Sequence, residues 1–161
     1  MTRIAISGHR GFSAEVAGLI DAAIRAELAR YAGNDVVGLS CLADGADQIF
    51  ARAVLDTGGK LEVFVPAARY RDALPASAHP EYDELISRAD AVHRLNHMES
   101  TAQSHMDASV EMLEVADLLF VVWDGLPARS FGGTADVVMH AREIGVPVTV
   151  IWPDGAHRDA A

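Results

Sequence analysis

The chain has a single cysteine, Cys41, and a single lysine, Lys60, among its 161 residues. One cysteine excludes a disulfide framework within the chain and a zinc site built from several cysteines. Basic residues are scarce as well, since 13 Lys and Arg stand against 23 Asp and Glu, a formal net charge of -10. This balance disfavours binding to the phosphate backbone of nucleic acid and to an anionic membrane surface.

Long hydrophobic runs are absent too. No segment reaches the length of a membrane-spanning helix, and the first residues lack the apolar core of a signal peptide. Half of the residues are nevertheless apolar, which is enough to build a core in a domain of this size. We therefore expect a soluble, cytoplasmic protein with one domain over residues 1–153 and a flexible tail over 154–161.

The sequence contains a regular alternation of two patterns. Short β-branched runs predict strands, and apolar residues three or four apart predict helices. The expected strands cover residues 3–7, 35–40, 61–65, 91–95, 118–123 and 148–152. The expected helices cover residues 14–32, 46–57, 81–88, 98–116 and 133–144, with an irregular stretch at 67–80.

Strands that are separated by helices pair in parallel through right-handed crossovers. The expected fold class is therefore α/β, a doubly wound, mostly parallel sheet with helices on both faces. Such sheets bind ligands outside the carboxyl ends of their strands, where the strand order reverses. The loops that follow the expected strands are consequently where a functional site is expected.

The first of these loops reads Ser7-Gly8-His9-Arg10-Gly11 and leads into a helix. Its glycines let the backbone approach a ligand, and the helix start offers N–H groups to an anion. Arg10 adds a guanidinium that suits phosphate. The alternative is a glycine turn with a solvated arginine.

Two common nucleotide-binding motifs are missing. The first loop lacks the G-x-G-x-x-G fingerprint of dinucleotide-binding folds, and G-x-x-x-x-G-K-[ST] occurs nowhere in the chain. A nicotinamide dehydrogenase and a P-loop NTPase are therefore both disfavoured.

The second loop, Ala43-Asp44-Gly45-Ala46-Asp47, is again a glycine turn before a helix. Asp44 suits the helix N-cap, and Asp47 suits the first turn, where negative charge complements the helix dipole. The functional alternative is that these carboxylates hold a sugar hydroxyl or position Arg10.

The loop after the most apolar strand carries the most information. It begins near Asp124, and Gly132-Gly133-Thr134 opens the last helix. Two glycines and a hydroxyl at a helix start form an arrangement that cradles anions. Thr134 can also serve only as a cap of the helix. Asp136, two residues further on, suits contact with a hydroxyl or a glycosidic bond.

Other chemistry-bearing side chains have simpler explanations. His93 and His97 are four residues apart, but the first lies on an expected strand, so they need not share a face. No H-E-x-x-H motif occurs, and we expect neither a metal nor a cofactor. Cys41 is expected to be a buried or partly buried, inert thiol.

Four motifs occur together in this order: Ile6-Ser7-Gly8-His9-Arg10, Ala43-Asp44-Gly45-Ala46-Asp47, Ala116-Asp117 and Gly132-Gly133-Thr134. As a set they resemble the SLOG superfamily, which includes LOG-type proteins and the DprA core, over residues 4–152. The resemblance implies a Rossmann-like fold and a nucleotide or nucleotide-derived ligand on glycine-rich loops. It also implies a homodimer or a higher homo-oligomer.

Enzymatic members similar to LOG hydrolyse the N-glycosidic bond of nucleoside monophosphates with an Arg and a Glu. The resemblance places Asp136 at the Glu position, where it would act as an acid or an electrostatic stabiliser. The Arg position falls on Ala108, so a group that would orient the ribose phosphate is missing. Binding without turnover fits this departure better.

We therefore predict that the chain binds a nucleotide or a nucleotide-derived phosphorylated molecule, as a sensor or accessory protein. The phosphate would lie on residues 8–11 and 132–134 with Arg10. The base and ribose would lie toward Pro66 and Tyr70, near Asp44 and Asp136. One alternative is a weak phosphoribohydrolase in which Asp136 and Arg10 are catalytic. Another is a DNA-handling module, which the net charge disfavours.

Overall fold

The computed structural model describes residues 1–129 and 131–158. Its elements are β1 (Thr2–Gly8), α1 (Ala14–Ala29), β2 (Val36–Ser40), α2 (Ala46–Asp56), β3 (Lys60–Val65), α3 (Tyr70–Ala73), the 3-10 helix η1 (Ala76–Ala78), α4 (His79–Ser87), β4 (Ala91–Arg94), α5 (Ala102–Val115), β5 (Leu118–Val122), α6 (Thr134–Glu143) and β6 (Val148–Ile151). Every strand and helix that the sequence predicts is present, with shifts of a few residues at the ends.

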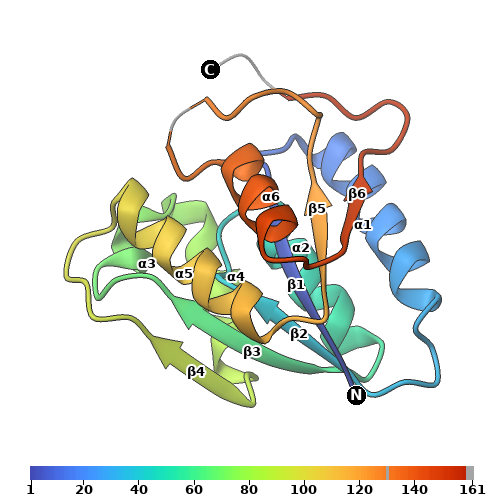
Figure 1. Cartoon of the computed structure of the whole chain (residues 1–161), viewed down its shortest axis with the longest axis horizontal. Helices are drawn as coiled ribbons and strands as arrows, with labels where there is room; N and C mark the ends of the chain where they lie inside the picture. Colours follow the sequence, from blue (N-terminus) through green and yellow to red (C-terminus); the bar gives the residue numbers. More distant parts are fainter. Residues whose placement is uncertain (130, 159–161) are drawn as a thin grey trace.

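The strands form one sheet in the order β4-β3-β2-β1-β5-β6, and every neighbouring pair is parallel (Figure 1). The chain builds outward from β1 to β4 and then returns to the other side of β1 with β5 and β6. The strand order therefore reverses between β1 and β5. The predicted α/β doubly wound sheet is confirmed.

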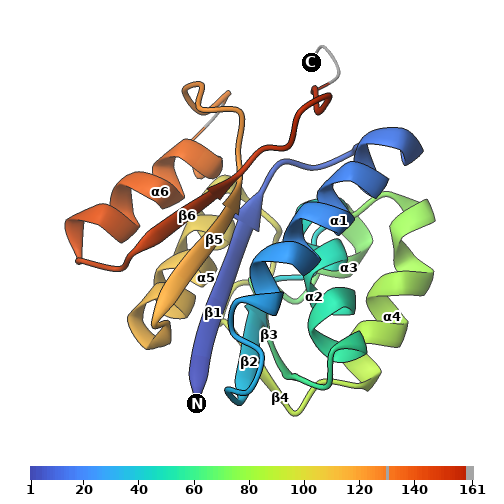
Figure 2. The ribbon, with the colours of Figure 1, turned by 90° about the vertical axis from the view of Figure 1, so that its right-hand side faces the viewer.

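Helices cover both faces of the sheet, with α1, α2 and α4 on one side and α5 and α6 on the other (Figure 2). Alternate residues of a strand point to opposite faces. Ile4 and Ile6 of β1 accordingly pack in one apolar cluster with Ile24 of α1 and Phe50 of α2.

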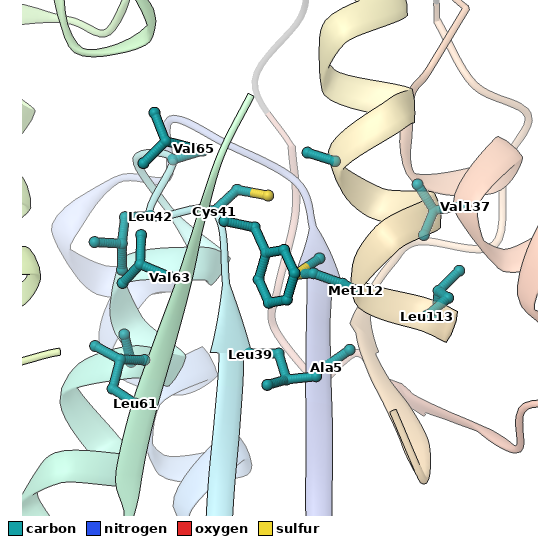
Figure 3. Packing of buried hydrophobic residues seen from close by; sticks show 14 of the residues in the cluster. Ala5, Leu39, Cys41, Leu42, Leu61, Val63, Val65, Met112, Leu113 and Val137 are labelled. Carbon is teal, nitrogen blue, oxygen red and sulfur yellow. The ribbon is translucent and has the colours of Figure 1, made fainter. Parts of the chain in front are cut away.

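The intervening residue of β1, Ala5, belongs to the cluster beneath α5 and α6. Figure 3 shows Met112 of α5 beside Ala5 and Leu39, with Val137 of α6 on the same side. Cys41 is buried at the edge of this cluster, as predicted, with 7% of its surface exposed. The strands are therefore apolar on both faces because each face carries its own helical layer.

The start of α5 differs from the expectation, which placed it at residue 98. Thr101 accepts a hydrogen bond from the N–H of Ser104, and Ser104 accepts one from the N–H of Thr101, which forms a capping box. The preceding residues are used elsewhere, because the carbonyls of His97 and Met98 accept from Ala68 and Arg69. These hydrogen bonds join the segment after β4 to the segment after β3.

The stretch 67–80, expected to be irregular, contains α3, η1 and the first residues of α4. Four-residue and three-residue helices are too short to display a helical period in a sequence. They are ordered by burial, since Tyr70, Leu74 and Ala78 are all inside the protein.

The segment after β6 was expected to be a flexible tail. Ala156 packs against the apolar cluster under α1, and Arg158 reaches Asp124, where Nη1 and Oδ2 are 3.8 Å apart. Residues 159–161 of the expected tail lie outside the described residues. The segment thus returns to the carboxyl edge of the sheet, beside the β5–α6 loop (Figure 1).

Candidate functional site

A cavity of about 440 Å³ lies over the carboxyl ends of β1, β2, β3 and β5. Its floor comes from the strand ends, including Ile6, Ser7 and Gly8, and its sides come from the start of α5 and the β5–α6 loop. The volume is within the range of small-molecule sites. The cavity occupies the reversal point of the strand order, where the fold predicts a ligand.

Glycines hold the first two loops against each other. Gly45 has a φ of +90°, and a Cβ there would lie 2.7 Å from the carbonyl oxygen of His9. That carbonyl accepts a hydrogen bond from the N–H of Ala46 over 3.2 Å. A Cβ on Gly8 would lie 2.5 Å from the Cβ of Ala46. These glycines are therefore needed for contact between two loops of the protein, in addition to any ligand.

The third glycine loop closes the opposite wall. Gly132 has a φ of +81°, and a Cβ there would lie 2.8 Å from the carbonyl oxygen of Ala102, at the start of α5. Gly133 is the N-cap of α6, with Thr134 as its first residue. Gly132, Gly133, Thr134 and Ala135 all line the cavity. The first turn of a helix has backbone N–H groups without intrahelical partners, which suits an anion.

His9 joins the ends of β1, β5 and α6. Its ring is buried, Nε2 accepts a hydrogen bond from the N–H of Asp124 over 3.1 Å, and Nδ1 lies 3.4 Å from Oγ1 of Thr134. Burial, followed by the charge of Arg158, lowers the pKa of His9, although Asp124 opposes this change. The ring is consequently neutral near pH 7, and it organises the cavity wall.

Arg10 lies on the cavity wall in an ion pair with Asp44. Its Nη2 is 2.7 Å from Oδ1 of Asp44, and its Nε donates to the same oxygen over 2.9 Å. Asp44 does not cap α2, whose N-cap is Gly45 with no side-chain hydrogen bond. Of the roles that the sequence left open for Asp44, the structure shows the positioning of Arg10.

Asp47 lies in the first turn of α2 and on the cavity wall. Its Oδ2 accepts a hydrogen bond from the N–H of Ala43 over 3.3 Å. Burial raises the pKa of Asp47 to about 7, against the opposing effects of Ala43 and Arg10. Tyr70, also on the wall, is buried, and burial together with Cys41 and Asp47 raises its pKa well above the ordinary value.

Two cavity arginines were not identified as site residues from the sequence. Arg129 comes from the β5–α6 loop, and Arg158 comes from the segment after β6. Burial and the charge of Arg129 lower the pKa of Arg158, whereas Asp124 raises it. Arg129 lies inside a loop that the sequence singles out, so its position was a usable signal. No signal in the sequence marked Arg158, because it lies in the expected tail.

His105 of α5 is a third wall residue that sequence reasoning missed. Its Nε2 is 2.7 Å from Oγ of Ser100, and its ring meets that of Tyr70 edge-on, with centroids 5.5 Å apart. Burial and the charge of Arg10 lower the pKa of His105. The sequence indicates the helix, but not that its first turn overhangs the sheet edge.

The structure brings most of the predicted ligand-binding residues into one cavity. On its wall lie Ser7, Gly8, His9, Arg10, Ala43, Asp47, Pro66, Tyr70, Gly132, Gly133 and Thr134. Gly11, Asp44 and Gly45 are instead among the residues that line a separate groove between α1 and α2. Asp124 and Asp136 do not line the cavity either.

The position of Asp136 bears on the alternative of catalysis. Its Oδ2 accepts a hydrogen bond from the N–H of Gly132 over 2.9 Å, so the carboxylate closes the loop before α6. Ala108, at the position where the resemblance expects an arginine, is fully buried in α5. The geometry gives no support to a catalytic role for Asp136, and that role stays an untested prediction.

Over residues 1–129 and 131–158, no three His, Cys, Asp or Glu side chains are grouped so that they could hold a metal ion. Within the same ranges, no helix has both the length and the apolar character that crossing a membrane requires.

No protein-family model matches the chain, and no curated protein matches it in sequence. Solved structures match it in fold. DNA processing protein A from Streptococcus pneumoniae aligns with a TM-score of 0.66 at 19% identity over 92% of this chain. This chain spans 50% of the length of that protein chain.

Two further structures share the arrangement. The structural-genomics target TM1055 aligns with a TM-score of 0.60 at 16% identity, over 92% of this chain and 72% of its own. A molybdenum cofactor binding protein from Rippkaea orientalis aligns with a TM-score of 0.57 at 12% identity, over 92% of this chain and 75% of its own. At such identities the likeness shows the fold. The chain therefore shares the Rossmann-like fold of these structures, which is the fold that the resemblance to the SLOG superfamily implies.

Proposed function

We propose that this chain binds a small phosphorylated ligand of the nucleotide class in the cavity at the carboxyl edge of its sheet. One observation supports this above all. In a chain with a net charge of -10, the cavity wall carries three arginines and, within the described residues, a single carboxylate. The arginines are Arg10, Arg129 and Arg158, and the carboxylate is that of Asp47.

The phosphate would bind between the start of α6 and the two arginines Arg129 and Arg158. Helix N-termini and guanidinium groups both stabilise phosphate, the latter through charge-assisted hydrogen bonds. Among the described residues, the ion pair of Arg158 is a long contact of 3.8 Å with Asp124, so a ligand anion can compete for it. The rest of the molecule would extend toward Pro66 and Tyr70.

A small ligand fits better than a nucleic-acid strand. A strand requires a basic surface along its backbone, whereas three arginines of this acidic chain lie together on the wall of a cavity. A structure of DNA processing protein A from Helicobacter pylori is described in terms of single-stranded DNA binding, at 18% identity to this chain. The Rippkaea orientalis protein is described as binding the molybdenum cofactor, which is compatible with a small-ligand site on this fold.

The proposal is tested by thermal unfolding and titration calorimetry with nucleoside monophosphates, nucleoside diphosphates, cyclic nucleotides and ADP-ribose. The matching unphosphorylated nucleosides serve as controls. We expect at least one phosphorylated compound to raise the melting temperature, because a ligand that binds only the folded state stabilises it. If none does at millimolar concentration, or if nucleosides bind equally well, the proposal is wrong.

Variants then locate the site. Arg129→Gln combined with Arg158→Gln should weaken binding by about 10-fold or more, as expected for the loss of charge-assisted hydrogen bonds. Arg30→Gln is the matched control, because Arg30 is exposed at the end of α1 and pairs with Glu27. Oligonucleotide binding that is as strong as mononucleotide binding, and steeply salt-dependent, would favour the DNA-handling alternative.

A further inference from the structure

Asp47 is the one wall residue of the cavity whose charge opposes the arginines. Within the described part of the chain, the only hydrogen bond of its carboxylate is the 3.3 Å contact of Oδ2 with the N–H of Ala43. Every fully buried side-chain polar atom of the described residues has a hydrogen-bond partner. Oδ1 of Asp47 has none, so it is not fully buried, and because Asp47 lines the cavity we infer that Oδ1 is open to it. A carboxylate oxygen therefore faces the space where a ligand would lie.

The protein itself does not neutralise this carboxylate. Arg10 is close enough to affect it, but its Nε and Nη2 are both directed to Oδ1 of Asp44. The negative charge of Asp44 also acts on Asp47, and so do the buried thiol of Cys41 and the buried phenol of Tyr70. The ring of His105 lies on the same cavity wall. Burial raises the pKa of Asp47 to about 7, so in the free protein its charge is poorly compensated.

Asp47 and the proposed phosphate site lie at different ends of the cavity. Asp47 belongs to the first turn of α2, the helix that follows β2, whereas Arg129 and the start of α6 follow β5. Strands β2 and β5 flank β1, so their ends are two inter-strand spacings apart, about 10 Å. A phosphorylated ligand held at the β5 end would therefore present its other end to Asp47.

Resting on the proposed function, we propose that Asp47 is the specificity-determining residue at this second end. Its open oxygen accepts a hydrogen bond from an N–H or O–H group of the ligand remote from the phosphate. The ligand class is thus a phosphorylated molecule with hydrogen-bond donors at its far end. A purine base and a ribose both supply such donors, and the probes below distinguish them.

This contact has a consequence in solution. A donor from the ligand stabilises the ionised form of Asp47, and the free protein holds a large fraction of it protonated near pH 7. Binding at pH 7 should therefore release a fraction of a proton. Calorimetry in two buffers with different ionisation enthalpies measures this number directly. A residue with a purely structural role would not change it.

The experiment compares the wild-type chain with Asp47→Asn, using pyrophosphate, ribose 5-phosphate, AMP, IMP and GMP. Pyrophosphate should bind both proteins within about 2-fold, because it reaches only the arginine end. The compounds that contact Asp47 should bind the variant about 10-fold more weakly at pH 8 and should release no proton from it. Asp72→Asn, which changes an exposed carboxylate of α3, is the control.

The different probe compounds distinguish the possible hydrogen-bond donors. A loss shared by ribose 5-phosphate and the nucleotides identifies the sugar as the donor, and a loss confined to particular nucleotides identifies the base. If Asp47→Asn binds every nucleotide as the wild type does, or loses pyrophosphate equally, Asp47 is not the specificity residue. If the wild type binds neither pyrophosphate nor any nucleotide, the proposed function itself fails. Thermal unfolding of the variant confirms that it is folded.

Discussion

The backbone N–H of Asp124 donates a hydrogen bond to Nε2 of His9 over 3.1 Å, and this bond joins the loops after β5 and β1. Nε2 also lies 3.2 Å from Oδ1 of Asp124, so the amide and the carboxylate of Asp124 both contact this nitrogen. The other ring nitrogen, Nδ1, faces Oγ1 of Thr134 at 3.4 Å. One neutral imidazole thus connects the two strand ends at the reversal point with the first residue of α6.

We predict that His9 stays neutral until the pH falls below its ordinary pKa. Burial and the charge of Arg158 lower the pKa of His9, so the unfolded chain binds a proton at a higher pH than the folded chain does. Stability from this group is therefore complete above pH 6.5 and is lost as the pH falls further. A histidine-resolved NMR titration measures the midpoint.

The spectrum of His9→Gln assigns the signal, because the chain has seven histidines. The same variant should show a weaker decline of stability between pH 6.5 and 5 than the wild type. A His9 midpoint above 6.5 would contradict the prediction, since it would mean that Asp124 outweighs burial.

Much of the fold can be predicted from the sequence, and so can the convergence of its loops. The apolar run 118–123 must be covered on both faces, and strands alternating with helices must be parallel. Parallel strands end at the same edge, which is why His9, Tyr70 and Thr134 were expected together and are found on one cavity wall. This expectation follows from the parallel arrangement of the strands alone and does not require knowing which side chains touch.

The remaining features depend on geometry that local sequence does not carry. Asp44 and Asp136 both suit a helix start, but Asp44 turns to Arg10 and Asp136 turns to the N–H of Gly132. The choice is made by the neighbouring loop, which is distant in sequence. Arg158 reaches the cavity because the chain after β6 folds back, and no periodic pattern marks that return.

Gly45 and Gly11 form a matched pair for testing how the loops meet. Both have positive φ, +90° and +70°, but only at Gly45 would a Cβ meet neighbouring atoms, with the carbonyl oxygen of His9 2.7 Å away. Gly11→Ala should cost about 1 kcal/mol, the strain of the left-handed region alone. Gly45→Ala should cost about 3 kcal/mol, because the backbone of Gly45, with φ 90° and ψ -131°, lies outside the left-handed region and a steric clash is added to that strain.

Urea unfolding measures both variants. Gly45→Ala should also weaken ligand binding, since the clash displaces the backbone of His9 and Arg10. Equal losses of stability in the two variants would mean that the loops can separate without cost, and that their packing does not shape the cavity.

Asp47→Asn should stabilise the free protein at alkaline pH. The folded pKa is about 7 against an ordinary value of 3.8, so the unfolded chain loses this proton first as the pH rises. Stability therefore falls between about pH 4 and pH 7, and the full cost is present above pH 7. The upper limit of that cost is about 4 kcal/mol. Asn removes it while its amide oxygen can still accept from Ala43.

Denaturant unfolding at pH 4 and pH 8 checks this prediction. The variant should match the wild type at pH 4 and exceed it at pH 8. A variant that is less stable at pH 8 would show that the carboxylate is compensated within the protein. Higher stability combined with weaker nucleotide binding would be the trade-off expected of a residue kept for binding.

Asp136 gives the sharpest test between binding and catalysis. Its carboxylate accepts from the N–H of Gly132, so Asp136→Ala should lower stability by about 1 kcal/mol, as the loss of a helix-capping bond does. Asp136→Asn keeps an acceptor oxygen and should remain close to the wild type in stability and in nucleotide affinity. We expect that neither the wild type nor either variant releases free base from nucleoside monophosphates in a chromatographic assay. Base release by the wild type that Asp136→Asn abolishes would instead establish the phosphoribohydrolase. The amide keeps the hydrogen-bonding geometry and removes only the charge, so such a result would require the carboxylate to take part in the reaction.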